Sequence, residues 1–192
     1  FAITRAARLA TINPKYVELG GRPCLPSVEA LPGKVDLVAI TTPPPTVAGA
    51  IRQAGAKGIP FALVLSGDFT CIGEQGVHWH QEVLAAARES GVRLIGPSSV
   101  GLMRSSLGMN ASFSPAPIRA GSLALVSQSG TIASSLLDFA WTAGFGFSSV
   151  VSTGAGIDVD VPDVLDFLAM DGATRAILVY VEGVRDARAF LS

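Results

Sequence analysis

The chain has 192 residues, enough for one or two domains, with 49% hydrophobic residues, 15% charged residues and a net charge of −1. This balance excludes the basic surface of a nucleic-acid-binding protein or of a protein held on an anionic membrane. No apolar run reaches the roughly 18 residues of a membrane-spanning helix, and no signal peptide is visible.

Two cysteines, Cys24 and Cys71, are far apart and match no metal-binding or redox spacing. We therefore expect two free thiols in a cytoplasmic protein.

In the first half of the chain, short apolar segments alternate with segments of helical spacing. Residues 1–9 look like the end of a helix or its exit loop, a strand then ends at 13–15, and 16–26 looks like a loop. Further along, we predict a helical turn at 27–32, strands at 35–40, 61–65 and 92–95, and helices at 46–57 and 77–90. This alternation predicts a doubly wound parallel sheet, an α/β fold.

Residues 104–121 lack periodicity and are interpreted as the connection between two domains. Alternation then restarts, with strands predicted at 123–126, 148–152 and 176–181, and helices at 131–143, 162–170 and from 186 onward. Three strands are few for an open sheet, and Phe1 is not a natural start. We expect a fragment, or the ordered part of a longer protein.

An apolar run, a small polar turn and a helical pattern follow one another in residues 123–137. Such a turn aims free backbone N–H groups and the positive end of a helix dipole at one point, where a phosphate binds well. The alternative is an ordinary turn in which a Ser or Thr caps the helix. The predicted phosphate-binding residues are Ser127, Gln128, Ser129, Gly130 and Thr131.

The predicted strands all end in small polar, Gly-rich or Pro-rich segments. In open α/β sheets ligands bind at these carboxyl ends, so the ends together favour a nucleotide-like ligand, although each by itself is ordinary turn chemistry. Glu182 follows the strand at 176–181 and is expected near the Ser127–Thr131 turn, where a carboxylate orients a basic group. The alternative for Glu182 is a solvated loop residue.

No metal site is expected. His78 and His80 are two residues apart on a predicted helix and therefore point to different faces. Asp158, Asp160 and Asp163 are expected to cap and charge the start of the helix at 162–170. The chain also lacks a P-loop and the Gly-x-Gly-x-x-Gly fingerprint.

The order of these motifs resembles the NDP-forming acyl-CoA synthetases, which include ADP-forming acetyl-CoA synthetase and the α subunit of succinyl-CoA synthetase. The resemblance covers essentially the whole chain. It is carried by Asn13-Pro14-Lys15, Pro26-Ser27-Val28, Val35-Asp36-Leu37, Ser66-Gly67, Gly73-Glu74, Gly96-Pro97, Gly101, Asn110, Ser127-Gln128-Ser129-Gly130 and Tyr180-Val181-Glu182-Gly183.

The resemblance implies two domains. Residues 1–119 are similar to a Rossmann-like CoA-binding domain, whose first strand and Gly-rich turn would precede Phe1. Residues 120–192 are similar to the first part of a flavodoxin-like ligase domain. The implied CoA-binding residues are Asn13, Pro14, Lys15, Thr42, Pro43, Ser66 and Gly67.

The implied reaction is acyl-CoA + phosphate + ADP ⇌ carboxylate + CoA + ATP, through an acyl phosphate and a phosphohistidine. The turn at Ser127–Thr131 matches the helix N-terminus that holds the phosphate, and Glu182 matches the Glu that hydrogen-bonds the phosphorylated histidine. ATP or ADP with Mg²⁺ would bind to an ATP-grasp domain or β subunit outside this chain. An oligomer is expected, with no nucleic-acid or membrane partner.

Three positions depart from the family pattern. The histidine would lie beyond Ser192, Gly96-Pro97-Ser98-Ser99 replaces Gly-Pro-Asn-Cys, and Gly154-Ala155 replaces Gly-Asn. A second hypothesis is therefore a catalytically inactive CoA-binding regulatory domain, as in protein lysine acetyltransferases. A third, a dinucleotide-dependent oxidoreductase, would need a Gly-rich fingerprint that the chain does not show.

Overall fold

The computed structural model describes residues 9–67, 69, 72–115 and 117–191. The chain divides into two compact units, Arg8–Leu94 and Ile95–Ser192. This division differs from the boundary expected at residue 119. The prediction for residues 1–9 falls almost wholly outside the described residues, as does Cys71, whereas Cys24 is a free thiol.

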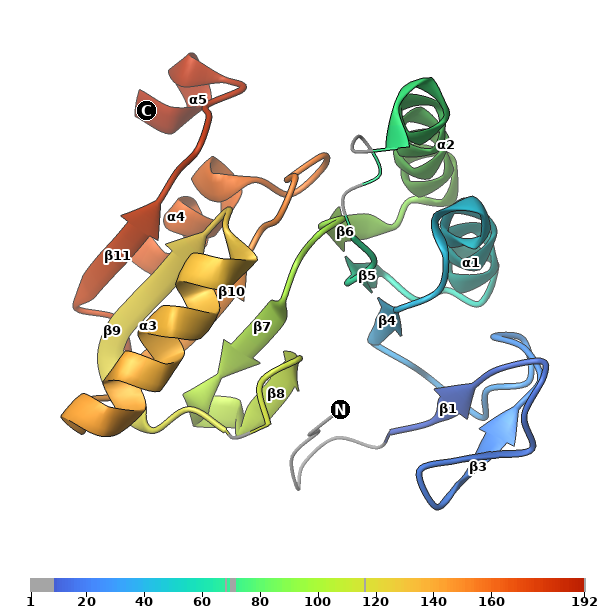
Figure 1. Ribbon diagram of the computed structural model, residues 1–192, viewed down its shortest axis with the longest axis horizontal. Helices are drawn as coiled ribbons and strands as arrows, with labels where there is room; N and C mark the ends of the chain where they lie inside the picture. Colours follow the sequence, from blue (N-terminus) through green and yellow to red (C-terminus); the bar gives the residue numbers. More distant parts are fainter. Residues whose placement is uncertain (1–8, 68, 70–71, 116, 192) are drawn as a thin grey trace. The chain divides into compact units, whose positions relative to one another are not determined.

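The first unit contains a three-stranded sheet in the order β4-β5-β6 and two helices that pack side by side (Figure 1). Prolines at the first positions of α1 preset the helical φ, and apolar residues at helical spacing bury one face of it. The close approach of the helices requires Gly55, since a Cβ there would lie 2.4 Å from Cβ of Ser90. The elements are β4 (Leu37–Ile40), α1 (Pro44–Ala56), β5 (Phe61–Val64), α2 (Glu74–Ser90) and β6 (Arg93–Ile95).

A second small sheet in this unit corrects the prediction of a loop at residues 16–26. β3 (Arg22–Leu25) pairs in parallel with β1 (Thr11–Ile12) and antiparallel with β2 (Glu18–Leu19). Gly20 and Gly21 form a tight hairpin turn, with φ of 59° and 75°, which is the conformation that two-residue hairpins favour. The glycines that suggested a loop in fact reverse the chain between two strands.

The second unit is built on a five-stranded sheet in the order β11-β9-β10-β7-β8. The central strand β9 (Ala120–Ser127) is parallel to β10 (Phe147–Ser152) and to β11 (Ala176–Tyr180). α3 (Gly130–Ala143) covers one face and α4 (Val161–Ala169) the other (Figure 1). Alternate residues of β9 divide between the two cores, with Leu125 facing α3 and its neighbours facing α4.

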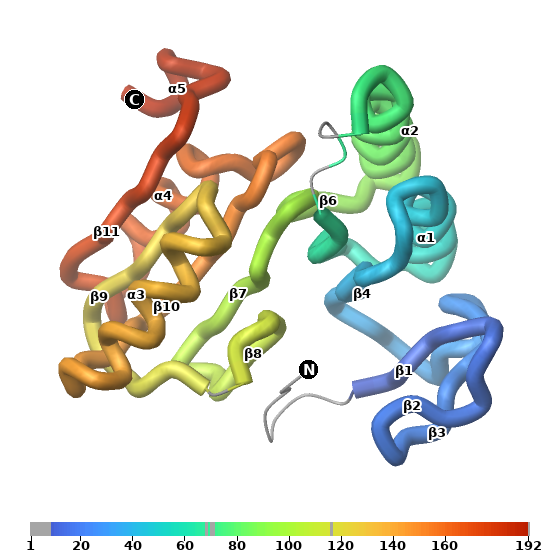
Figure 2. The backbone as a smooth tube through the Cα atoms, viewed as in Figure 1, coloured from blue at the N-terminus to red at the C-terminus, as the bar shows by residue number. Residues whose placement is uncertain are grey.

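In the structure, the first half of the expected domain connection at residues 104–121 forms part of a hairpin of the second unit. β7 (Gly101–Arg104) and β8 (Met109–Ser112) pair antiparallel, joined by the short helix η2 (Ser105–Leu107), and β7 pairs antiparallel with β10. Figure 2 follows the chain from β6 through this hairpin into β9. The sheet is therefore mixed: its three predicted parallel strands are extended by two antiparallel ones.

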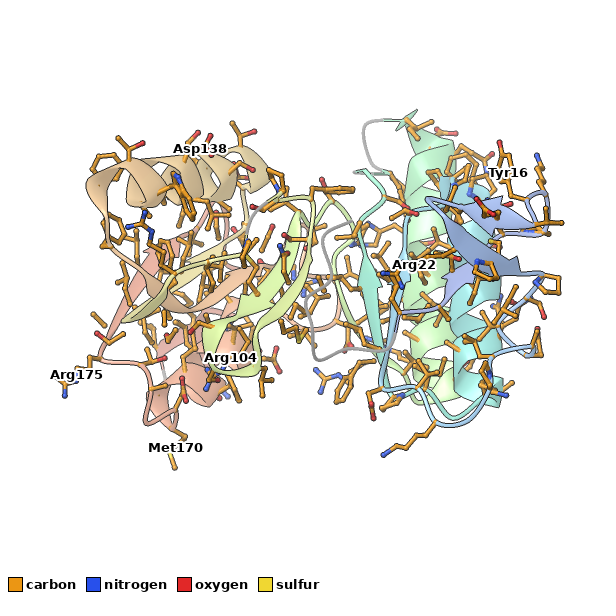
Figure 3. All side chains as sticks on the ribbon, turned by 90° about the horizontal axis from the view of Figure 1, so that it is seen from below. Tyr16, Arg22, Arg104, Asp138, Met170 and Arg175 are labelled. Carbon is orange, nitrogen blue, oxygen red and sulfur yellow. The ribbon has the colours of Figure 1, made fainter. Side chains whose placement is uncertain are left out.

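A partly buried ion pair ties this hairpin to the end of α4. Arg104, labelled in Figure 3, donates two hydrogen bonds to Asp171, at 2.6 and 2.7 Å, with side chains only 18% and 10% exposed. Hydrogen bonds from Arg104 and Thr174 hold the pKa of Asp171 well below its usual range. The pair fastens an edge of the sheet to the turn before β11.

The last described element is the short helix α5 (Ala187–Leu191). Within the described residues, no helix is both long and apolar enough to cross a membrane.

Candidate functional site

The predicted strand–turn–helix is present, and it is held by its own serines. β9 ends at Ser127, and α3 begins at Gly130 with Ser129 as its N-cap. The buried Ser127 hydroxyl donates to the Ser129 carbonyl at 2.7 Å and accepts from the Ser129 amide at 3.1 Å. The Ser129 hydroxyl accepts from the amide of Ile132 at 3.3 Å. These bonds fix the turn without any ligand.

Four donors of this turn remain available to an anion. The amides of Gly130 and Thr131 lie in the first turn of the helix and have no intrahelical acceptor. The other two donors are hydroxyls: that of Ser129, whose proton is not used by the cap bond, and that of the exposed Thr131. The Ser127 hydroxyl, also predicted to bind phosphate, is consumed within the turn. The geometry can therefore hold an anion at the positive end of the helix dipole.

Gly130 is required by the neighbouring segment. A Cβ at this position would lie 2.4 Å from Cγ1 of Val100, which precedes β7 in the same unit. Nothing in the sequence around Val100 predicts this contact, because it joins segments 30 residues apart.

Gln128 connects the turn to the segment that carries Glu182. Its backbone amide donates to the Tyr180 carbonyl at 3.1 Å. Its side-chain Oε1 accepts from the amides of Glu182, at 2.6 Å, and Gly183, at 3.0 Å, while Nε2 donates to the Gly183 carbonyl at 2.9 Å. Glu182 is exposed, and its carboxylate makes no hydrogen bond with any residue of the described chain. The structure thus places Glu182 beside the turn, as the sequence analysis expected.

The end of β10 lies beside the Ser127–Thr131 turn, with the Thr153 amide donating to the Ser127 carbonyl at 2.9 Å. The loop after it packs on residues 96–99, with the Ala155 amide donating to the Pro97 carbonyl at 2.9 Å. Gly154 has φ of +59°, and a Cβ there would lie 2.2 Å from that carbonyl oxygen. Gly154 is therefore needed for the close approach of two backbones. Its neighbour Thr153 is fully buried, and the Thr153 hydroxyl lacks a partner among the described residues.

A cavity of about 290 Å³ lies between the start of α4 and residues 181–190. Its walls carry five carboxylates and one cation, Arg185, so it repels phosphate, and the candidate for an anion site is the α3 side of Gln128. Arg185 contacts Asp160 at 3.3 Å and also donates to the Gly156 carbonyl. The carboxylates are Asp158, Asp160, Asp163, Asp166 and Asp186.

The expected capping of α4 is confirmed for two of the three aspartates. The Asp160 side chain accepts from the Val161 amide at 2.8 Å, and Asp163 accepts from the Asp160 amide at 3.0 Å, which completes a capping box. Over the described residues, no group of three or more His, Cys, Asp or Glu side chains is arranged to hold a metal ion. His78 lies 3.4 Å from Glu82, one helical turn away.

In the first unit, the ends of β4 and β5 lie together, as parallel strands require. The Ser66 hydroxyl donates to the Thr42 carbonyl at 2.6 Å, and the hydroxyls of Thr42 and Thr46 are 2.7 Å apart. Thr42, Pro43 and Gly67 are exposed, so this edge is accessible to a ligand. Asn13, Pro14 and Lys15 follow β1 in the other sheet, where the Asn13 side chain accepts from the Lys15 amide at 2.9 Å.

The N-terminus of α1, which lies at this edge, differs from the α3 turn in its backbone donors. Residues 43–45 are all proline and lack N–H groups, and the Thr46 amide is bonded to the Pro43 carbonyl at 3.0 Å. The N-terminus of α1 therefore offers few backbone donors. Lys15 is exposed, and its ammonium has no ion-pair partner within the described chain, so its charge is available to an anion.

Comparison with protein families gives two matches. Residues 2–105 match the CoA binding domain, and residues 120–192 match the succinyl-CoA ligase like flavodoxin domain. The first match ends within η2, beyond the boundary of the compact unit.

Similar proteins are ADP-forming ligases. The chain is 39% identical to acetate–CoA ligase [ADP-forming] I of Archaeoglobus fulgidus, over 94% of this chain and 26% of that protein. It is 36% identical to the α subunit of the Pyrococcus furiosus ligase I, over 91% of this chain and 38% of that subunit.

A solved structure of an acetyl-coenzyme A synthetase also resembles this chain. Dinucleotide-forming acetyl-coenzyme A synthetase 1 of Ca. Korarchaeum cryptofilum superposes with a TM-score of 0.87 at 35% identity, covering 94% of this chain and 39% of that one. The chain thus spans about a quarter to two fifths of the proteins it resembles.

Proposed function

The chain belongs to the NDP-forming acyl-CoA synthetase family, and from this premise we propose that it is the CoA-binding part of a ligase that interconverts acyl-CoA, phosphate and ADP with carboxylate, CoA and ATP. The main support is that the side chain of Gln128 links Glu182 to the N-terminus of α3, which has free donors for an anion. A phosphoryl carrier and its hydrogen-bonding carboxylate need to meet, and these bonds support the proposal because they hold Glu182 beside the helix N-terminus.

In this proposal, the free amides of Gly130 and Thr131 and the hydroxyls of Ser129 and Thr131 hold the phosphoryl group. Donors that are fixed before the ligand arrives stabilise developing negative charge without reorganisation. Glu182 accepts a hydrogen bond from the ring of the histidine that carries the phosphoryl group. That histidine belongs to a segment outside these residues.

Coenzyme A binds the first unit, which carries the CoA binding domain. We assign its contacts to Asn13, Pro14, Lys15, Thr42, Pro43, Ser66 and Gly67. Lys15 supplies positive charge for the phosphates, and the exposed edge at Thr42 and Gly67 supplies apolar and backbone contact. ATP or ADP with Mg²⁺ binds an ATP-grasp domain or β subunit, and the complete ligase is an oligomer. The free thiol of Cys24 suits a cytoplasmic location.

The phosphoryl step is tested in the full-length protein with γ-phosphate-labelled ATP and Mg²⁺. We expect acid-labile, base-stable protein phosphate that Glu182→Gln reduces and the exposed control Glu18→Gln leaves unchanged. Absence of labelling, with CoA binding intact, would refute the ligase and leave the CoA-binding regulatory domain as the function.

The CoA site is tested by titration calorimetry with CoA. Lys15→Ala is expected to weaken binding about tenfold, because a charge-assisted contact with phosphate contributes about 1.5 kcal/mol. The control Lys34→Ala removes an exposed lysine that is 3.6 Å from Asp36, and it should leave the affinity unchanged. Equal effects of both variants would refute the assignment.

A further inference from the structure

The side-chain amide of Gln128 is fully engaged by protein groups. Oε1 accepts two hydrogen bonds, from the amides of Glu182 and Gly183. Nε2 donates to the Gly183 carbonyl and approaches Oδ1 of Asp160 at 3.5 Å. A glutamine side chain has two acceptor sites and two N–H donors, and all four face partners here. The two amides facing Oε1 also fix which end of the side chain is oxygen.

These bonds continue the sheet beyond its last strand pair. Ser127 is the last residue of β9 in register with Tyr180, and the Gln128 amide then bonds to the Tyr180 carbonyl. One step further the backbone of α3 has turned away, and the Gln128 side chain takes the place of a strand. It pairs with both the N–H and the C=O of Gly183, as a neighbouring backbone would.

The segment is held from its other end as well. Arg185 contacts Asp160 at 3.3 Å and donates to the Gly156 carbonyl. Asp160 is itself 9% exposed and fixed by the capping box of α4. Residues 182–185 are therefore tied to the α3 turn at one end and to the α4 turn at the other. Between these ties, the Glu182 carboxylate stays exposed and is not hydrogen-bonded by the described residues.

We infer that Gln128 is a positioning residue: it holds the backbone of Glu182 beside the N-terminus of α3, and its side chain does not contact the phosphoryl group. The inference rests on the proposed function, in which Glu182 meets the phosphohistidine. It also distinguishes Gln128 from its neighbours in the turn, since its backbone amide and both side-chain N–H groups already have acceptors. Gly130 and Thr131 are left as the anion's backbone donors.

A double-mutant cycle in the full-length protein tests this assignment. The rate of ATP formation from acetyl-CoA, phosphate and ADP is measured for wild type, Gln128→Ala, Glu182→Gln and the double variant. Gln81→Ala, an exposed glutamine of α2, is the matched control. If Glu182→Gln leaves no measurable rate, Glu182→Asp takes its place in the cycle. Thermal unfolding of each variant is recorded alongside.

We expect Gln128→Ala to lower kcat by roughly tenfold to a hundredfold, the effect of losing two hydrogen bonds that position a reacting group. The KM for phosphate should stay within about twofold, because no phosphate contact is lost. In the Glu182 background, Gln128→Ala should cost less than about threefold, since it acts through a group already removed. Gln81→Ala should match wild type.

Two results would overturn the inference while leaving the function intact. One is an active wild type in which Gln128→Ala raises the KM for phosphate and leaves kcat unchanged. The other is full additivity of the two substitutions, which would show that Gln128 acts independently of Glu182. An inactive wild type would refute the proposed function, and the inference with it.

Discussion

Replacing Gly130 by alanine tests the packing that seats the candidate anion site. The new Cβ would lie 2.4 Å from Cγ1 of Val100, whereas carbon atoms in contact are separated by about 3.5–4.0 Å. More than about 1 Å of separation must be recovered by moving the helix start or Val100. Overpacking of this kind costs about 1–3 kcal/mol. It outweighs the gain of about 0.4–1 kcal/mol from replacing a helical glycine.

Val100→Ala should reverse the sign. With Cγ1 absent, the added methyl group fills the vacated space, so Gly130→Ala in the Val100→Ala background should be neutral or stabilising by up to about 1 kcal/mol. The two substitutions therefore couple favourably by about 1.5 kcal/mol or more. Gly49→Ala is the matched control, because this glycine is also helical and has no atom within 4 Å of its built Cβ. It should stabilise its own unit.

Urea unfolding followed by tryptophan fluorescence measures both effects. The two tryptophans lie in different units, Trp79 in α2 and Trp141 in α3, so Trp79→Phe leaves Trp141 as the reporter of the second unit. A fall of about 1–2 kcal/mol in the free energy of unfolding is expected for Gly130→Ala. A Gly130→Ala variant that is as stable as wild type while Val100 is present would refute the expected collision.

Three further substitutions have definite expected outcomes. Ser129→Ala removes the N-cap of α3 and should cost about 1 kcal/mol of unfolding free energy, while Ser134→Ala on the exposed side of the same helix should cost nothing; equal effects would contradict the cap. Gly154→Ala combines a left-handed φ of +59° with a backbone collision, so a loss of more than about 2 kcal/mol is expected by the same urea assay. For Asp171→Asn, the pKa of Asp171 is lowered by Arg104, so the wild-type advantage should be complete above about pH 5 and should shrink as the pH falls below about 4. A pH-independent difference in melting temperature would contradict this last prediction.

The helices and parallel strands were predictable because each buries a regular apolar face. The strand at β9 and the helix at α3 show it best: a run of four apolar residues and a 3.6-residue spacing are strong local signals. The hairpin of β7 and β8 has no such signal. Its second strand reads Met-Asn-Ala-Ser, and the buried Asn110 and Ser112 are bonded to each other at 2.6 Å and to the backbone of Ser114. Polar residues bonded in pairs look like a loop in the sequence.

The strand–turn–helix at Ser127–Thr131 and the approach of Glu182 to it were also predictable, because parallel strands end at one edge of a sheet. Which polar groups of the turn are bonded within the protein, and which stay free, was not predictable. Ser127 and Gln128 have the same polar character as Ser129 and Thr131, yet their side-chain donors are bonded within the protein, whereas the Ser129 hydroxyl accepts its cap bond and keeps its proton free. The Gln128 amide is engaged by residues 180–183, far away in the sequence, and the Ser127 hydroxyl by the way the turn brings the Ser129 carbonyl to it.

The position of the β7–β8 hairpin decides where the chain can be divided for separate expression. The hairpin follows the first unit in sequence but covers the edge of β10. A second unit expressed from residue 120 would leave that edge bare, and an unpaired edge strand recruits other chains into aggregates. One that begins at residue 95 keeps the edge covered and retains both Arg104 and its partner Asp171. A gene fusion that carries the second unit should therefore join it before Ile95, even though the CoA binding domain match extends to residue 105.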